Sequence, residues 1–309
     1  MADIRFVQAD TLKEKPADVS KVGFGRVFTD YMFEMDYNPE EGWHDARIVP
    51  YQDVPLSPAN ATLHYGQAIF EGCKAYRYEG GKAVVFRAKD HIARLNRSAK
   101  ILDIPEVDEK LVYDALMKLI DLEKDWIPDG PGQSLYIRPF IFSTDPYLGV
   151  SVGQYYKMMI ILSPVGAYYA NGFAPVKIMV EDTYVRAPKG GLGAARTPAN
   201  YAASLHGGLI AHEKGYDQTL WTDGIEHKYI GEVGSMNILF KIDGKVVTPE
   251  LDGTILDGIT RRTVLRVCKE WGIPTEERRI SIDELIEDYE NGKLEEVFGS
   301  GTAAVISPV

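Results

Sequence analysis

Cysteine is scarce in this sequence. Only Cys73 and Cys268 occur among 309 residues, and they form no Cys-x-x-Cys pair. This usage indicates neither a disulfide framework nor a cysteine metal site, and it is typical of a reducing compartment. The 6 histidines include no pair spaced four residues apart beside an acid, so no metal ion is predicted.

Long apolar runs and an excess of positive charge are also missing. The apolar run 158–162 has the size of a strand, whereas a membrane-spanning helix needs about 20 residues, so no membrane segment is predicted. The 34 basic and 45 acidic residues give a net charge of -11, which disfavours nucleic acid or an anionic membrane as the main partner. The start of the chain is typical of neither a secretory signal nor a transit peptide. We therefore predict a cytoplasmic protein of small-molecule metabolism.

Helix-period and strand-period segments alternate along the chain without internal repeats, which predicts an α/β or α+β protein. The length is typical of two domains. We predict a smaller N-terminal domain at 1–165, a linker rich in small residues at 166–175, and a larger C-terminal domain at 176–309. In the first domain, an apolar stripe predicts a helix over 108–126, and alternation predicts a strand over 133–142.

The second domain has its own local signals. They predict strands near 177–181, Thr219 and Tyr229, and a helix over about 200–214. A hairpin is predicted across Asp243 and Gly244, and a helix is predicted to begin at the capping box of Ser281 and Glu284. The apolar strand at 303–309 has no following segment to close its pattern. We therefore expect either a truncated chain or a short natural variant.

The most informative segment is Gly193-Ala-Ala-Arg196-Thr-Pro-Ala-Asn-Tyr201-Ala-Ala-Ser-Leu205. It resembles the cofactor-lysine segment of the branched-chain amino acid aminotransferases, except that arginine occupies the Schiff-base lysine position. Further segments agree with this family in order, at 63–77, 86–99, 134–139, 231–237 and 298–303. The resemblance implies the two-domain fold of the fold type IV aminotransferases, with pyridoxal 5'-phosphate as the cofactor. A guanidinium has a pKa above ~12 and forms no imine, so we expect this form to be inactive.

The resemblance also assigns the cofactor contacts. Glu232 corresponds to the glutamate at the pyridine nitrogen, where a carboxylate keeps the nitrogen protonated, and Tyr201 corresponds to the tyrosine at the ring oxygen. Arg94 corresponds to the arginine that reaches the phosphate, a dianion suited to bidentate guanidinium contacts. The remaining cofactor contacts that the resemblance implies are Ser235, the backbone of Ile255, and Thr302.

Substrate contacts are implied in the same way. Tyr65 and Phe70 correspond to walls of an apolar pocket, and Tyr136 and Arg138 to the pair that holds the substrate carboxylate. Ala303 is expected beside the substrate as well. Apolar walls with one anion clamp are what leucine, isoleucine and valine require.

The reaction that the resemblance implies is amino-group transfer between a branched-chain amino acid and 2-oxoglutarate. Members of the family are homodimers, and the residue that corresponds to Tyr65 reaches across the interface. Two alternatives stay open. One is a natural non-catalytic homologue that binds the cofactor or a partner, and the other is a different enzyme of this fold, a D-amino acid aminotransferase or an aminodeoxychorismate lyase. Segments 63–77 and 134–139 favour the branched-chain group.

Overall fold

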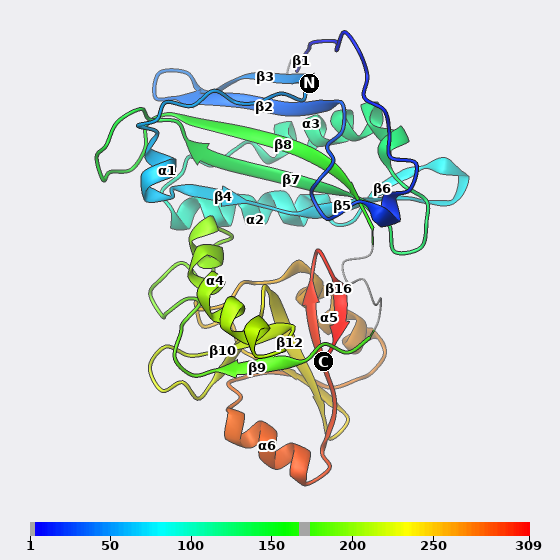
Figure 1. Ribbon diagram of the computed structural model, residues 1–309, viewed down its shortest axis with the longest axis vertical. Coiled ribbons are helices and arrows are strands. Elements are labelled where there is room, and N and C mark those ends of the chain that lie inside the picture. Colours follow the sequence, from blue (N-terminus) through cyan, green and yellow to red (C-terminus); the bar gives the residue numbers. More distant parts are fainter. Residues whose placement is uncertain (1–3, 167–173) are drawn as a thin grey trace. The chain divides into compact units, whose positions relative to one another are not determined.

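The computed structural model describes residues 4–166 and 174–309. The chain divides into two compact units, unit 1 (Met1–Tyr168) and unit 2 (Tyr169–Val309), shown in Figure 1. Most of the predicted linker 166–175 lies outside the described residues. Each unit contains its own sheet and its own buried apolar core.

Unit 1 is built on a sheet with the strand order β1-β3-β2-β8-β7-β5-β6, and β4 pairs with β7 outside this path. Its strands are β1 (Arg5–Phe6), β2 (Tyr31–Asn38), β3 (Gly42–Pro50), β4 (Ala68–Phe70), β5 (Cys73–Arg77), β6 (Ala83–Val85), β7 (Ser134–Ser143) and β8 (Tyr156–Val165). Its helices are α1 (Ala61–Tyr65), α2 (Ala88–Ile101) and α3 (Glu109–Leu122), with the short 3-10 helices η1 (Val19–Lys21), η2 (Glu79–Gly81) and η3 (Lys124–Trp126).

The core of unit 1 lies between this sheet and the helices α2 and α3, which run along one face of the sheet in Figure 1. Phe33 and Met35, alternate residues of β2, are fully buried in this core, and Leu116 and Leu119 of α3 pack in the same cluster. The carboxylate of Asp108 caps the start of α3 by accepting two backbone amides of its first turn. The apolar stripe that predicted this helix is therefore the face that packs on the sheet.

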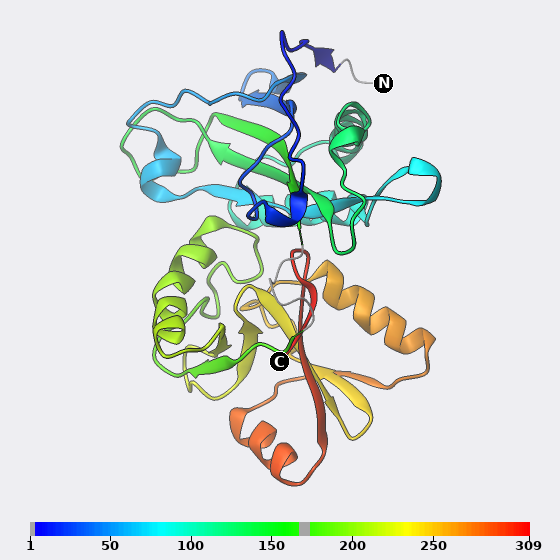
Figure 2. The same cartoon turned by 45° about the vertical axis from the view of Figure 1, so that its right-hand side comes forward.

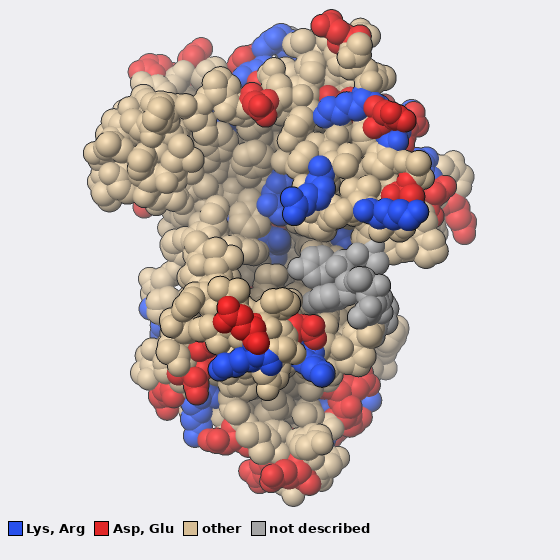
Figure 3. Space-filling view, viewed as in Figure 1, with Lys and Arg blue, Asp and Glu red and all other residues tan. Residues whose placement is uncertain are grey.

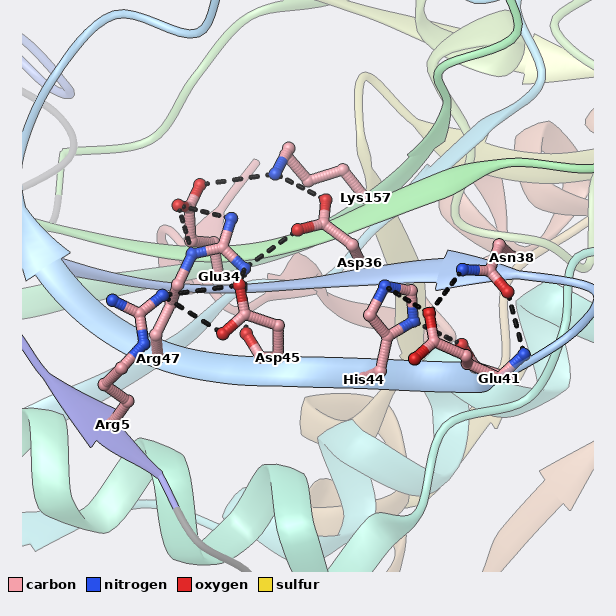
Figure 4. A network of polar contacts seen from close by, with 10 residues as sticks. Arg5, Glu34, Asp36, Asn38, Glu41, His44, Asp45, Arg47 and Lys157 are labelled. Atoms are coloured by element: carbon pink, nitrogen blue, oxygen red, sulfur yellow. Dashed lines mark hydrogen bonds and ion pairs between the residues drawn. The ribbon is translucent and has the colours of Figure 1, made fainter.

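The opposite face of the unit 1 sheet carries a charged network (Figure 4). The guanidinium of Arg47 on β3 lies 2.7 Å from the carboxylate of Glu34 and 2.8 Å from that of Asp36, both on β2. The amine of Lys157 on β8 lies 2.6 Å from Asp36. These ion pairs connect three adjacent strands on a face that otherwise buries apolar side chains such as Met32.

Unit 2 has a second sheet with the strand order β14-β13-β12-β11-β10-β9, to which β15 adds beside β12 and β16 beside β15. Its strands are β9 (Ile178–Glu181), β10 (Gln218–Thr222), β11 (Ile230–Val233), β12 (Met236–Ile242), β13 (Lys245–Thr248), β14 (Thr275–Glu277), β15 (Leu294–Gly301) and β16 (Val305–Pro308). Its helices are α4 (Pro198–Glu213), α5 (Ile259–Glu270) and α6 (Ile282–Glu290).

Strand β12 is at the centre of unit 2, and its two faces contribute to different apolar clusters. Ile238 and Phe240 pack in one cluster with Leu285 of α6, whereas Leu239 packs in another with Cys268 of α5. α4 packs against β9 and β10, and α5 against β14 and β15, so the two helices cover different strands (Figure 2). The strands between them carry the polar residues described below.

Several local predictions are confirmed. α3 occupies the predicted helix but ends at Leu122, after which η3 begins, and β7 matches the predicted strand. Asp243 and Gly244 form the turn between β12 and β13 with φ of 47° and 71°, the left-handed values that a two-residue hairpin requires. At the start of α6, the hydroxyl of Ser281 accepts a hydrogen bond of 3.1 Å from the backbone amide of Glu284.

The structure also contains the helix predicted at about 200–214 and the strand predicted at the end of the chain. α4 begins earlier than predicted, because Pro198 occupies its first turn, where the missing amide of a proline costs no hydrogen bond. The apolar strand predicted at the end of the chain is β16, which pairs with β15. In the ranges 4–166 and 174–309, no helix is long and apolar enough to cross a membrane.

Candidate cofactor and substrate site

Arg196 lies in a loop of unit 2 whose backbone is held by its neighbours. The side-chain amide of Asn200 donates hydrogen bonds to two carbonyls of this loop, one of them that of Ala195 at 2.9 Å. Gly193 lies directly against the turn at Thr254, because an added Cβ would stand 2.2 Å from the Thr254 carbonyl oxygen. The backbone at position 196 is therefore fixed by groups other than its own side chain.

Tyr201 lies in the first turn of α4, directly after this loop. Both Arg196 and Tyr201 are half-buried, whereas Lys189, earlier on the same loop, is exposed. The N-cap residue Thr197 is fully buried between them. The two predicted cofactor residues thus stand on one short, anchored stretch of chain.

Glu232 is a buried carboxylate on β11 that contacts polar groups from three other segments of unit 2. Its Oε1 accepts hydrogen bonds from the side-chain amide of Asn237 at 3.1 Å and from the backbone amide of Leu256 at 3.0 Å. Its Oε2 lies 3.0 Å from Nε of Arg186, and the side chain of Glu232 is only 5% exposed. These contacts offset the cost of burying an ionised group.

The strand register places Glu232 in a row with two other polar residues across the sheet. Glu232 on β11 pairs with Asn237 on β12, which in turn pairs with Ser300 on β15. Side chains of directly opposed residues point to the same face. The row therefore lies on the face of the sheet that carries Leu239, since Asn237 and Leu239 alternate along β12.

Two turns extend from this end of the three strands. Ser235 lies exposed in the turn between β11 and β12. Thr302 and Ala303 lie half-buried in the turn between β15 and β16. The strands β12 and β15 are antiparallel, and Asn237 at the start of β12 faces Ser300 near the end of β15. Both turns therefore lie at the same end of these strands.

The turn that contains Ile255 lies beside Glu232. Ile255 is buried. The backbone amide of the next residue, Leu256, donates the hydrogen bond to Glu232. Gly253 has φ of +96°, a conformation that L side chains rarely adopt. A small pocket lined by Arg186, Glu232 and this turn lies here, and none of Arg196, Tyr201 and Thr302 lines it.

In unit 1, three of the predicted substrate residues come together. The guanidinium of Arg138 lies 4.6 Å from the centre of the Phe70 ring and donates to the hydroxyl of Tyr136 at 3.2 Å. Phe140 continues the same face of β7. Within the described part of the chain, Nε of Arg138 is buried without a hydrogen-bond partner and no carboxylate pairs with this guanidinium, as expected of an arginine that binds an external anion.

Lys74 is a polar residue of this face that the sequence did not single out. It pairs with Tyr136 across β5 and β7, so both side chains point to the same face. Lys74 is buried, and desolvation lowers the pKa of its amine to about 8. Its position within 63–77 is the only sequence signal that could have found it.

Arg94, the predicted phosphate residue, lies on α2 and is held by a buried acid. Its Nε and Nη2 donate to the carboxylate of Glu71 at 2.6 Å and 2.9 Å. The ring of His91 contacts the same carboxylate at 2.9 Å. The three side chains are almost inaccessible, so the orientation of Arg94 is fixed within unit 1.

Tyr65 ends the short helix α1 and is exposed. The same part of unit 1 exposes Leu63 and, on the β7–β8 connection, Leu148, Val150 and Val152. Figure 3 shows few charged side chains at the left of unit 1, where Figure 1 places α1 and this connection. Exposed apolar patches of this kind are typical of protein interfaces.

Residues 68–309 match the family model for amino-transferase class IV. This chain belongs to the class IV aminotransferases. The branched-chain-amino-acid aminotransferase 2 of Bacillus subtilis (strain 168) is 55% identical over 306 residues, which are 99% of this chain and 84% of that protein.

Solved structures agree with this membership. A branched-chain aminotransferase from Thermoproteus uzoniensis, solved with norvaline, has a TM-score of 0.76 and 27% identity, covering 90% of this chain and 86% of that chain. The T.th. branched-chain amino acid aminotransferase with pyridoxamine 5'-phosphate has a TM-score of 0.73 and 27% identity, covering 90% and 84%. The predicted family and the fold of the fold type IV aminotransferases are confirmed.

Proposed function

We propose that this chain is built to transfer amino groups between branched-chain amino acids and 2-oxo acids with pyridoxal phosphate, and that Arg196 removes its covalent hold on the cofactor. The observation that carries the proposal is the buried carboxylate of Glu232, fixed by Asn237 and Leu256 at 3.1 Å and 3.0 Å. Such a carboxylate keeps a pyridine nitrogen protonated. When bound, the cofactor supplies an electron sink for the amino acid substrate.

The other cofactor contacts are assigned by the same resemblance. Tyr201 is proposed to donate to the ring oxygen, and Arg94 to bind the phosphate together with residues of three turns of unit 2. These turn residues supply hydroxyls and backbone amides, which suit a phosphate; they are Ser235, Ile255 and Thr302. The donor set contains an acid, a phenol, a guanidinium and hydroxyls, and therefore fits this cofactor.

Arg138 is proposed to bind the substrate carboxylate, with Tyr136 beside it. The contact of Arg138 with the Phe70 ring at 4.6 Å places a cation at the border of an apolar wall. Tyr65 and Ala303 complete the proposed pocket. An amino acid with an aliphatic side chain suits this combination, in agreement with the names of the relatives.

Position 196 decides the chemistry. A lysine there would both hold the cofactor aldehyde and carry a proton to and from the substrate, because a neutral amine can do both. A guanidinium stays protonated and can do neither. We therefore propose that this form is inactive, and that it arose from an active enzyme by one replacement, since Glu232, Tyr201 and Arg94 remain.

The proposal extends to a homodimer in the cytoplasm. The exposed apolar residues of α1 and the β7–β8 connection, Leu63, Tyr65, Leu148, Val150 and Val152, support an interface on unit 1. A net charge of -11 and the use of only Cys73 and Cys268 support a reducing compartment without anionic polymers as partners.

An activity assay on Arg196→Lys tests the proposal. The variant is expected to form glutamate from L-leucine and 2-oxoglutarate, and the unchanged chain to form none above background. D-Leucine and D-alanine serve as controls for a D-amino acid aminotransferase, and aminodeoxychorismate for the lyase. Activity with one of these controls but not with L-leucine would overturn the substrate assignment. A variant that binds the cofactor and turns over none of them would favour a binding protein.

A further inference from the structure

Arg186 is a cation beside Glu232, and the sequence did not single it out. It lies in the loop after β9, and its side chain is only 10% exposed. Its Nε lies 3.0 Å from Oε2 of Glu232. A largely buried guanidinium at this distance stabilises the ionised carboxylate and restrains its rotation.

The same guanidinium makes a second contact. Its Nη2 donates to the carbonyl of Thr254 at 2.7 Å, in the turn that precedes Ile255. Gly193 approaches this carbonyl so closely that a Cβ would stand 2.2 Å from its oxygen. One side chain therefore ties together the acid proposed for the ring nitrogen, the turn proposed for the phosphate, and the loop that leads to position 196.

We infer that Arg186 is a positioning residue of the cofactor site, acting through Glu232 and the Thr254 turn rather than by contact with the cofactor. The inference rests on the proposed function, because it assumes that Glu232 faces the ring nitrogen. The two carboxylate oxygens of Glu232 have different partners in unit 2. Oε1 accepts hydrogen bonds from the side-chain amide of Asn237 and the backbone amide of Leu256, and Oε2 forms the ion pair with Arg186.

Charge gives the direction of the effect. A proton shared between a carboxylate and a pyridine nitrogen resides on the nitrogen only while the carboxylate is the weaker base. A neighbouring guanidinium makes a carboxylate a weaker base, and removing that guanidinium makes it a stronger one. Loss of Arg186 should therefore move the proton away from the ring nitrogen, toward Glu232.

The experiment measures the ring nitrogen directly. Pyridoxal phosphate labelled with nitrogen-15 in the ring is bound non-covalently to the unchanged chain, Arg186→Met, Arg186→Lys and the matched control Arg266→Met. Arg266 is an exposed arginine of the same unit that pairs with Glu270 on its own helix. Nuclear magnetic resonance reports whether the nitrogen is protonated, and absorbance titration reports the dissociation constant for pyridoxal phosphate and for pyridoxal.

Arg186→Met is expected to shift the nitrogen signal toward the unprotonated position and to weaken the binding of both cofactor forms by about tenfold. Arg266→Met should match the unchanged chain. Arg186→Lys keeps the charge but cannot make both contacts, so the nitrogen should stay protonated while binding weakens. This variant also keeps the inference testable if Arg186→Met does not fold.

Three results would overturn the inference. One is an unchanged nitrogen signal and affinity in folded Arg186→Met, and a second is unchanged affinity in Arg186→Lys. The third is a loss confined to pyridoxal phosphate with pyridoxal unaffected, because it would make Arg186 a direct phosphate ligand. If the unchanged chain itself bound neither cofactor form, the proposed function would fail instead, which separates the two failures.

Discussion

The side-chain amide of Asn200 donates a hydrogen bond of 2.9 Å to the carbonyl of Ala195, the residue directly before Arg196. This contact spans the start of α4 and holds the loop by its backbone. Replacement of the side chain at position 196 therefore leaves this support of the loop in place. The fold is expected to tolerate arginine or lysine there, whereas the chemistry is not.

The packing of this loop gives a prediction about Gly193. Gly193→Ala should destabilise the protein by about 1–3 kcal/mol, because the new methyl group would overlap the Thr254 backbone. Gly208→Ala on α4 is the matched control, since no atom lies within 4 Å of its added Cβ. Alanine in a helix should raise stability there by about 0.5–1 kcal/mol. Urea unfolding measures both, and equal effects of the two substitutions would refute the close approach.

Glu232→Gln tests the acid at the ring nitrogen. In the Arg196→Lys background, turnover should fall at least about tenfold, which corresponds to 1.4 kcal/mol of transition-state stabilisation. The amide keeps the shape of the side chain but carries no negative charge to hold a proton on the ring. Rates with L-leucine at saturating cofactor measure the effect. Unchanged turnover would reduce Glu232 to a structural residue of β11.

Arg138→Met tests the carboxylate clamp. Binding of 4-methyl-2-oxopentanoate to the cofactor-loaded protein should weaken at least about tenfold, because a charged hydrogen-bond donor is lost. 4-Methyl-2-oxopentanamide, in which a neutral amide replaces the carboxylate, is the matched ligand and should bind both proteins alike. Titration calorimetry compares the two ligands. Equal losses for both would point to damage of the Phe70 wall rather than to loss of an anion contact.

Glu123 makes stability depend on pH. Burial raises its pKa to about 7, with a further contribution from Asp30, although the Tyr31 amide donates to it. Its folded pKa lies above the unfolded value, so the folded state is favoured fully below about pH 4.5 and loses this advantage as pH rises through about 7. Unfolding free energy should therefore fall across this window, by up to about 3 kcal/mol from this group.

Glu123→Gln should remove that contribution and raise stability at pH 8, because the amide oxygen can still accept from Tyr31 without carrying a charge. Glu40→Gln, at an exposed position of the same unit, should leave the pH profile unchanged. Urea unfolding across the pH range compares the two variants. A Glu123→Gln profile that still declines with pH like that of the unchanged chain would disprove the assignment.

Local patterns in the sequence sufficed for several elements of this fold. The stripe of α3, the alternation of β7 and the turn at Asp243 and Gly244 are properties of neighbouring residues, which the chain displays directly. The resemblance supplied Glu232 and Arg138. The pairing of Arg186 with Glu232 escaped notice, because two residues on different strands or loops leave no spacing signal.

The burial of Lys74 and the pairing of Arg94 with Glu71 were also beyond local patterns. Both depend on which residues the sheet and α2 bring together, and a lysine or arginine in a periodic segment is typical of an exposed face. The structure instead buries these cations. Their segments could be recognised from the sequence, but their environments could not.

The central claim is that Arg196 removes covalent attachment of the cofactor from an otherwise intact site. The most direct measurement adds pyridoxal phosphate to the unchanged chain and to Arg196→Lys, reduces both with borohydride, and maps the cofactor mass on peptides. We expect no cofactor on the 193–205 peptide of the unchanged chain, and stable cofactor on the same peptide of Arg196→Lys. Cofactor attached to Lys189 of the unchanged chain, or none attached at position 196 of the lysine variant, would contradict the claim.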